Sequence, residues 1–344
     1  MRKFVFLYFA ILLFAIVIIP LCIIVGAGKF EYKDYMLVEQ ERKDQIENSA
    51  NDDKTTVENN AIKQIKVYNH KAKKTVKMDL EKYLICVVSA EMPYTYELEA
   101  LKAQAVAARS YTYARVIGDI KQRDSSHKGA TICTDYKHCQ AYLGYSELKK
   151  NKEKLDKITK AVNQTKGMVL KYNGKVANLL FHACSGGMTD TAKNVWGGDN
   201  VPYLKSVESP GEEEYQYFKS KVVVDKDDFY NRFKGLKDKI VKEKSNAVSD
   251  DYVKVISTSP AKRVIQIEVN GCVYRGVDIR EAFGLRSTMF TITEDKKNIT
   301  FNVKGYGHGV GMSQVGANAM AQKDKKYDEI LAHYYSGTKL GKVY

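Results

Sequence analysis

The chain of 344 residues is long enough for one large domain or two ordinary ones, and its 44% hydrophobic and 28% charged residues are typical of a globular protein with ample material for a core. Its formal net charge of +14 comes from lysines scattered along the sequence, so a solvated surface accounts for most of it, and no nucleic-acid partner is expected. Charge therefore does not select a substrate.

The N-terminal segment is apolar. Residues 4–27 carry no charge, and about 24 residues at a rise of 1.5 Å each are enough to cross a bilayer. Arg2 and Lys3 precede this run, which favours a cytoplasmic N-terminus and an exported body. Residues 25–27 resemble a small-residue cleavage site, so a cleaved signal is the alternative; the length of the run favours an uncleaved anchor. We predict a cytoplasmic tip and transmembrane helix over 1–27.

A polar stretch without periodicity follows, and we predict a flexible linker over 28–61. From residue 62 the pattern becomes that of a folded extracytoplasmic domain, which extends to 344. Two alternating runs around Asn69 and His70 predict a β-hairpin. Asp79 is placed to cap a helix that Pro93 ends, and a second helix is predicted over 97–116.

The remaining elements alternate between helices and hairpins. A charged amphipathic helix is expected over 149–166, and Asn173-Gly174 is the signal of a type I′ hairpin. Further helices are predicted over 227–236, over 278–285 and from Ser313, and strands over 252–258, 263–269, 288–294 and 298–305. We predict an α+β fold of β-hairpins and mixed sheet, with several helices lining a substrate groove and with residues 211–250 as an inserted subregion.

Glu91 stands at the end of the first helix. The helix dipole disfavours a carboxylate there by about 0.3–1 kcal/mol, and apolar and aromatic neighbours also disfavour its ionisation, so the pKa of Glu91 is expected to be raised. A general acid that works near neutral pH needs such a shift. Lys102 and Arg109 lie seven residues apart, hence on one face of the second helix, where they would hold polar groups of a ligand. A surface glutamate and a solvated helix face are the plainer interpretations.

Histidine and cysteine are concentrated in the loop after the second helix. His127, Cys133 and Cys139 are six residues apart in turn, with His138 beside the last of them. In an exported protein two nearby cysteines predict a disulfide, whereas two thiolates and an imidazole also suit a three-ligand zinc site with water, His138 or a remote group as the fourth ligand. The spacing leaves both open.

Two other segments could carry chemistry. His182 and Cys184 offer a nucleophile beside a histidine, with Ser185 as the other candidate, but an ordinary strand-to-loop transition is the favoured interpretation. The run GYGHGVG lacks the lysine of a phosphate-binding loop and has His308 among its glycines. Because glycines allow a ligand to approach the backbone closely, we interpret this run as the wall of a site.

Five segments together resemble the SpoIID/LytB family: EMP with ELEALKAQAVAARSYTYAR, CQAYLG, HACSGGMT, NVWGGDNVPYL and GYGHGVGMSQVGA. They occur in the family's order and cover roughly residues 60–340. The resemblance implies a membrane-anchored lytic transglycosylase of an endospore-forming, clostridial bacterium, which acts during engulfment. It would cleave the MurNAc–GlcNAc β-1,4 bond of denuded peptidoglycan strands and leave a 1,6-anhydroMurNAc end.

The resemblance also implies roles for individual residues. Glu91 of the EMP motif would be the acid and then the base, and no second carboxylate is needed because the C6 hydroxyl of the sugar attacks the anomeric carbon. It implies a structural zinc ion on His127, Cys133 and Cys139, with no cofactor required for the chemistry. The substrate would contact nine further residues: Lys102, Arg109, Gln140, Ser185, Thr189, Tyr306, His308, Ser313 and Gln314.

The family implies partners as well. These are the amidase known as stage II sporulation protein P, the membrane protein known as stage II sporulation protein M, and the glycan strands themselves. The domain would lie outside the mother-cell engulfing membrane on a single-pass anchor. The alternative function is a non-catalytic wall-binding module that enhances an amidase.

Overall fold

The computed structural model describes residues 63–118, 127–243 and 252–344, which belong to one compact unit. The predicted anchor and the whole of the predicted linker lie outside the described residues. Within the described ranges, no helix is long and apolar enough to cross a membrane.

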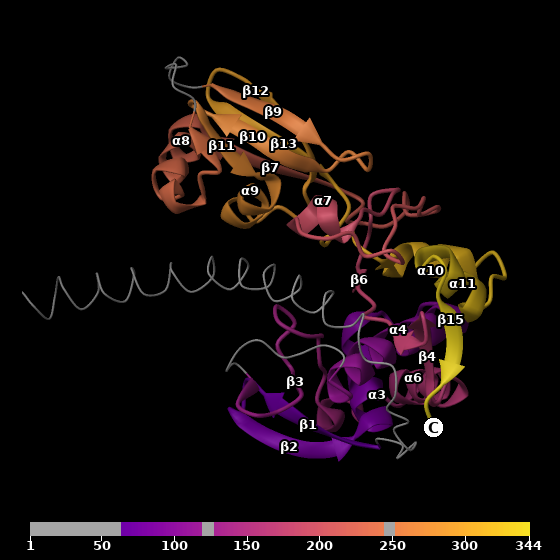
Figure 1. Ribbon diagram of the computed structural model, residues 1–344. Coiled ribbons are helices and arrows are strands. Elements are labelled where there is room, and N and C mark those ends of the chain that lie inside the picture. Colours follow the sequence, from indigo (N-terminus) through magenta and orange to yellow (C-terminus); the bar gives the residue numbers. More distant parts are fainter. Residues whose placement is uncertain (1–62, 119–126, 244–251) are drawn as a thin grey trace, which may run out of the picture. The chain divides into compact units, whose positions relative to one another are not determined.

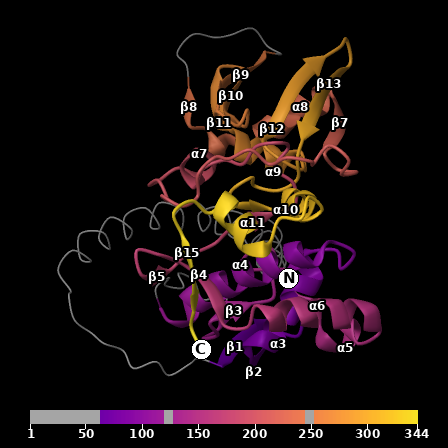
Figure 2. The ribbon, with the colours of Figure 1, turned by 90° about the vertical axis from the view of Figure 1, so that its right-hand side faces the viewer.

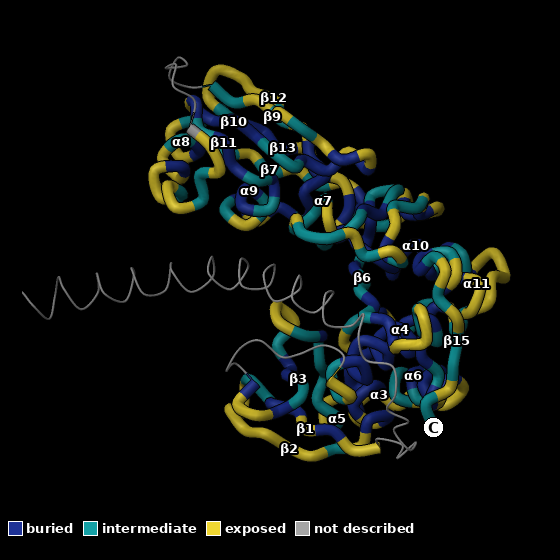
Figure 3. The backbone as a smooth tube through the Cα atoms, viewed as in Figure 1, coloured by how far each residue is buried: buried dark blue, intermediate teal, exposed yellow. Residues whose placement is uncertain are grey.

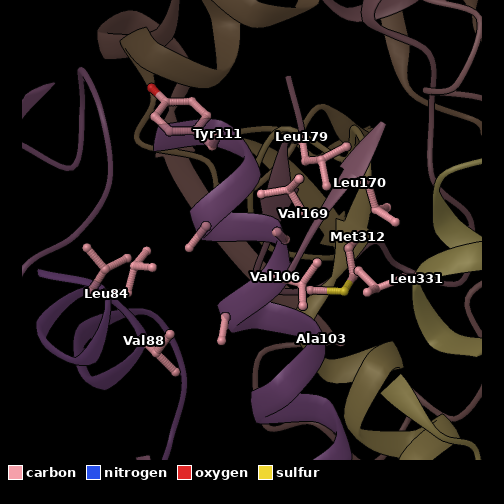
Figure 4. Packing of buried hydrophobic residues seen from close by; sticks show 14 of the residues in the cluster. Leu84, Val88, Ala103, Val106, Tyr111, Val169, Leu170, Leu179, Met312 and Leu331 are labelled. Atoms are coloured by element: carbon pink, nitrogen blue, oxygen red, sulfur yellow. The ribbon is translucent and has the colours of Figure 1, made fainter. Parts of the chain in front are cut away.

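The first hydrophobic core is built around helix α4 (Leu98–Val116). Its residues from Ala100 to Ala114 are buried except Lys102, so the helix is covered on nearly every face (Figure 3). Alanines at many of these positions let neighbouring backbones approach closely. Figure 4 shows Val106 facing Val169, Met312 and Leu331, which come from distant parts of the chain.

Five other helices accompany α4. Helix α3 (Leu80–Glu91) begins at Asp79, whose side chain accepts a hydrogen bond from the amide of Lys82 as predicted, and it ends two residues before Pro93. The others are α5 (Tyr145–Leu148), α6 (Lys152–Gln164), α10 (Gln314–Ala321) and α11 (Tyr327–Tyr334).

Three small sheets border the first core. They comprise β2-β1-β3, from Lys74–Asp79, Gln64–Asn69 and Ile132–Cys133; β15-β4-β5, from Lys339–Lys342, Met168–Tyr172 and Lys175–Val176; and the parallel pair of β6 (Phe181–His182) and β14 (Met312–Ser313). Both predicted hairpins are confirmed, and Asn173 and Gly174 have the positive φ values, 49° and 80°, that a type I′ turn requires. Strand β2 is exposed along most of its length (Figure 3).

A second core lies in a continuous stretch of sequence, from Phe229 to Val303, and is rich in phenylalanine. Figures 1 and 2 show its elements grouped together. Its two sheets are β12-β13-β7 and β8-β11-β10-β9, and their strands are β7 (Lys219–Asp225), β8 (Lys242–Glu243), β9 (Val253–Thr258), β10 (Val264–Val269), β11 (Cys272–Arg275), β12 (Met289–Glu294) and β13 (Asn298–Lys304). The helices are α8 (Lys226–Lys234), the 3₁₀ turn η3 (Lys237–Lys239) and α9 (Gly276–Ala282); α7 (Ala192–Trp196) belongs to the loop that precedes this core.

The segment that carries the second core leaves and re-enters the first part of the chain at one point. Lys219 pairs with Lys304 in the β7–β13 register, and the amide of Gly305 donates a hydrogen bond of 2.9 Å to the carbonyl of Phe218. Residues 219–304 are therefore an insertion whose two ends meet, and the first core is assembled from the residues on either side of it.

The mixed α+β class is confirmed. The longer elements that were not predicted include α11, β15 and β7, and short elements such as α5 and α7 were not predicted either. Strand β7 (KSKVVVD) alternates between exposed and half-buried residues. Lysines occupy the exposed positions of its first half, so its sequence resembles that of a charged loop.

Candidate active site

Glu91 is held between two segments that are distant in sequence. Its Oε1 accepts a hydrogen bond of 2.7 Å from the amide of Ala141, and its Oε2 accepts one of 3.3 Å from Nε2 of Gln314. These donors lie 50 and 223 residues further along the chain. The carboxyl group thus has a fixed position at the C-terminus of α3.

Burial raises the pKa of the Glu91 carboxyl, and the hydrogen bonds from Ala141 and Gln314 lower it by less. The predicted direction of the shift is therefore confirmed, and desolvation is its main cause. A protonated carboxyl remains available at a higher pH than for an exposed glutamate, which is the property required of a general acid.

The glycine-rich loop and the start of α10 bring Gln314 to Glu91. Ser313 caps α10, as predicted, because its Oγ accepts a hydrogen bond from the amide of Gly316. Gly311 has φ of 74°, and a Cβ there would lie 2.0 Å from the carbonyl oxygen of Leu180. Only glycine allows the loop to pack this closely on the strand that leads to His182.

The buried carboxylate of Glu212 accepts hydrogen bonds from several loops and from the start of α10, and so connects them. Its Oε1 accepts hydrogen bonds from the amide of Ser185 at 3.0 Å, from Oγ of Ser209 at 2.9 Å and from Oγ of Ser313. Its Oε2 accepts one from the amide of Gly187 at 2.7 Å. Sequence reasoning missed Glu212, which is the first of three consecutive glutamates and has no distinguishing pattern.

Several residues predicted to contact the substrate have their side chains engaged inside the protein. Ser185 and Thr189 are fully buried and bond to Glu212 and to the carbonyl of Lys205. Gln140 is 2% exposed and donates to the hydroxyl of Thr112. Of the predicted set, Gln314 is the residue that bonds to Glu91 directly.

Arg109 has a structural position. It is 0% exposed, and its guanidinium forms two hydrogen bonds with Glu81, at 2.9 and 2.6 Å, and a further one with the carbonyl of Met168 at 3.1 Å. The predicted role in substrate binding does not fit this environment, because the face of α4 that carries Arg109 is covered by α6 and β4 rather than by solvent.

Lys102, seven residues earlier, is partly exposed. Its Nζ lies 2.6 Å from Glu99 and 5.8 Å from the centre of the Tyr327 ring. It thus forms contacts at the start of α4 and with α11, and none of these contacts involves Glu91.

Tyr306 and His308 differ in exposure and surroundings. Tyr306 is 40% exposed, and the Arg286 guanidinium lies 5.6 Å from its ring and 4.1 Å from that of Tyr217. The ring of His308 packs 5.1 Å from Trp196. Burial, with the nearby positive charges of Arg280 and Arg263, lowers the pKa of His308 to about 3, so its imidazole is neutral.

The alternative nucleophile does not have suitable surroundings. Cys184 is 0% exposed, and burial together with Glu212 raises the pKa of its thiol to about 12. Burial lowers the pKa of His182, whose Nδ1 donates to the carbonyl of Val310 at 3.2 Å. A buried neutral thiol is a poor nucleophile, so the structure does not support chemistry based on Cys184.

The histidine and cysteine side chains of the loop after α4 converge. The ligand atoms of His127, Cys133, His138 and Cys139 all lie within 4.8 Å of one another. Nε2 of His127 lies 2.7 Å from Nδ1 of His138 and 3.2 Å from Sγ of Cys139. His138, which the sequence left as one of several options, joins the three predicted ligands.

This cluster fits a zinc ion. Zn–S bonds of about 2.3 Å and Zn–N bonds of about 2.0 Å in a tetrahedron put neighbouring ligand atoms roughly 3.3–3.8 Å apart. Three sulfur–nitrogen separations here are 3.2, 3.5 and 3.6 Å, and the two imidazole nitrogens lie closer, at 2.7 Å. Cys133 and Cys139 are both free thiols rather than a disulfide. Two thiolates and two imidazoles leave no open coordination position, which is typical of a structural site rather than a catalytic one.

Comparisons with known proteins agree on one family. Residues 68–172 match the family model SpoIID, described as stage II sporulation protein. The chain is 36% identical over 284 residues to stage II sporulation protein D of Bacillus subtilis (strain 168), which covers 81% of this chain and 79% of that protein. The protein of the same name from Bacillus amyloliquefaciens is 34% identical over the same shares.

A third relative has a different name. The amidase enhancer of Bacillus subtilis (strain 168) is 31% identical over 301 residues, which cover 74% of this chain and 39% of that protein. The identity and coverage of these relatives, together with the family match, show that the chain belongs to the SpoIID/LytB family.

Proposed function

We propose that the protein is a peptidoglycan lytic transglycosylase in which Glu91 is both acid and base. The observation that carries this proposal is the environment of Glu91: a part-buried carboxyl with a raised pKa, held at two oxygens by Ala141 and Gln314. Among the described residues, no acidic side chain contributes to the pKa shift of Glu91, whose causes are burial and the hydrogen bonds from Ala141 and Gln314. Hydrolysis by two carboxylates requires a partner about 5–9.5 Å away.

One carboxyl is enough for an intramolecular reaction. Protonated Glu91 gives its proton to the glycosidic oxygen as the bond from C1 of MurNAc to that oxygen breaks. The carboxylate then takes the proton of the C6 hydroxyl as O6 bonds to C1, which closes the 1,6-anhydro ring and restores the acid. The reaction consumes no water and needs no metal ion, so the four-ligand cluster is assigned to stability of the loop that contains it.

A group of tyrosines that includes Tyr96 would provide a surface for sugars. Tyr96, five residues after Glu91, packs with Tyr215, Cys184 and Val315. The Tyr215 and Tyr217 rings are 5.6 Å apart, and those of Tyr217 and Tyr306 are 6.1 Å apart. Aromatic rings present apolar faces and hydroxyl groups together, which suits contact with pyranose rings.

The cellular setting is proposed from the family and the sequence. The helix predicted over residues 4–27 would anchor the domain on the outer face of the membrane, where stage II sporulation proteins P and M would be its partners during engulfment. The name of one relative, amidase enhancer, supports a second candidate: a wall-binding module that stimulates an amidase without cleaving glycan.

Product analysis separates these two functions. The full-length chain should release products ending in anhydroMurNAc from denuded glycan strands, as identified by mass spectrometry, and Glu91→Gln should release none. Glu97→Gln is the matched control, because Glu97 is exposed and lies close in sequence. If the unaltered chain gives no anhydro products while it still stimulates an amidase on whole cell walls, the enhancer function is correct and the transglycosylase is not.

A further inference from the structure

A cavity of about 930 Å³ lies on the outer face of the sheet β12-β13-β7. Its walls include the loop at Gly186–Met188, the loop at Glu208–Pro210 and the turn at Pro260–Lys262. A volume of this size accommodates several sugar units. None of the residues proposed above to act on the substrate lines this cavity.

Lysine side chains dominate the charge of the cavity. Lys219, Lys221, Lys262 and Lys304 line it, against two acidic residues, Glu208 and Glu213. All four lysines are exposed, and none forms an ion pair with another described residue. Lys219 and Lys304 face each other across neighbouring strands. Like charges in directly opposed positions are destabilising, and a bound anion would relieve this repulsion.

The uncharged residues indicate what kind of anion fits. Thr291, Asn302 and Lys221 form one cross-strand row, and Met289, Lys304 and Lys219 form the next. Hydroxyl and amide groups beside an apolar side chain suit the polar edges and apolar faces of sugars. Phe290 is the sole aromatic lining residue, and it is buried in the second core, so no ring is free to stack on a nucleobase.

The cavity is linked to the surroundings of Glu91 by the chain and by hydrogen bonds. Lys219 follows Tyr217 by two residues and Lys304 precedes Tyr306 by two, and the rings of these two tyrosines lie 6.1 Å apart. Gly187 and Ser209 line the cavity and donate hydrogen bonds to Glu212, which accepts another from Ser313, the residue before Gln314.

We propose that this cavity binds lactyl carboxylates of the glycan strand, several sugars away from the bond at Glu91. In a strand that carries stem peptides the lactyl group is an amide, and removal of the peptide converts it to a carboxylate on every second sugar. The lysines would thereby distinguish denuded strands from peptide-bearing ones. This inference rests on the proposed function for the identity of the substrate.

Binding, rather than cleavage, tests the inference. Full-length Glu91→Gln protein in detergent micelles is titrated with fluorescent glycan strands of two kinds: denuded strands, and the same strands with their carboxylates converted to methylamides. Anisotropy should give about tenfold tighter binding of the carboxylated strand, the effect of roughly three exposed charge contacts, and the difference should disappear at high salt.

A triple variant tests the lysines directly. Lys219→Gln, Lys221→Gln and Lys304→Gln together, named the cavity variant, should bind both strands with the affinity that the methylamide strand shows for the parent protein. The control removes three lysines from the hairpin of the first core: Lys66→Gln, Lys74→Gln and Lys77→Gln. It should keep the preference for carboxylate, although its net charge changes by the same amount.

Each outcome decides the question. Equal affinity of the parent protein for the two strands refutes the inference, and this arm needs no variant and so is independent of folding. Loss of preference in the control as much as in the cavity variant refutes it too, because the effect is then one of net charge. Stronger lysine-dependent binding of peptide-bearing strands or of a phosphate polymer assigns the cavity to that ligand instead. Lysine-dependent preference in a protein that produces no anhydro products would uphold the inference and refute the proposed reaction.

Discussion

Replacement of Glu212 by alanine should destabilise the protein and disturb the site at the same time. The carboxylate is fully buried and accepts hydrogen bonds from two backbone amides, those of Ser185 and Gly187, and from the hydroxyls of Ser185, Ser209 and Ser313. The hydroxyls can rotate toward each other after the substitution. The two amides cannot, so they are left buried without an acceptor.

The expected loss of stability follows from those two amides. A buried donor without a partner costs about 1–3 kcal/mol, which gives about 2–6 kcal/mol for the pair. Removal of a buried negative charge also relieves a desolvation penalty and brings the net effect toward the lower half of that range, about 3 kcal/mol. Because Ser313 loses its acceptor next to Gln314, the proposed transglycosylase activity should fall even at temperatures at which the variant is folded.

Guanidinium unfolding followed by tryptophan fluorescence measures the effect. Trp196 is the single tryptophan of the chain and packs against His308 in the same group of loops, so its emission reports on this region. Glu214→Ala, at an exposed position two residues away, is the matched control and should change stability by less than about 0.5 kcal/mol. If Glu212→Ala unfolds within that margin of the unaltered protein, the network around Glu212 does not hold these loops together.

Three further predictions concern the hydrogen bond to Glu91, the metal cluster and the buried ion pair. Gln314→Met removes a hydrogen bond that lowers the pKa of Glu91, so the alkaline limb of the pH–kcat/KM profile should move to higher pH; a shift to lower pH contradicts the assignment of Glu91 as acid. If the cluster holds the proposed zinc ion, a chelator should lower the free energy of unfolding, and Cys139→Ala should abolish this response; an unchanged melting curve refutes the structural metal. Arg109→Met leaves Glu81 buried and unpaired, so denaturant unfolding should show a loss of about 3–5 kcal/mol, part of which the additional Glu81→Gln substitution restores; a loss below about 1 kcal/mol would contradict the buried pairing.

Local signals were sufficient for most of the fold. Asp79 and Ser313 cap their helices as side chains of this kind do, and Asn173-Gly174 makes the expected turn. Strand β15 was missed because its pairing with β4 joins residues about 170 positions apart, and no local pattern in KLGK indicates such a partner. We predicted the insertion over 211–250, whereas it spans 219–304. The charged residues of β7 and α8 were visible in the sequence, but the pairing of β7 with β13 was not.

The position of Glu91 at the end of α3 and the direction of its pKa shift were predictable, whereas its surroundings were much less so. Helix periodicity put Lys102 and Arg109 on one face, but it could not show that α6 and β4 cover the end that carries Arg109. A charged residue on a polar helix face gives the same sequence pattern whether its side chain is solvated or pairs with a buried carboxylate. For the same reason Glu212 could not be identified from the sequence, because the burial of its side chain arises from tertiary packing and not from its neighbours in sequence.

The insertion also sets an order of assembly for a chain that is made from its N-terminus. The second core is contiguous and can close once synthesis has passed Val303, whereas the first core lacks α10, α11 and β15 until the final residues are present. Gln314 and Ser313, which complete the surroundings of Glu91 and Glu212, arrive with that last part. With the proposed activity, the protein would thus acquire its complete site only after α10 has been synthesised, and fragments that end before α10 would lack it.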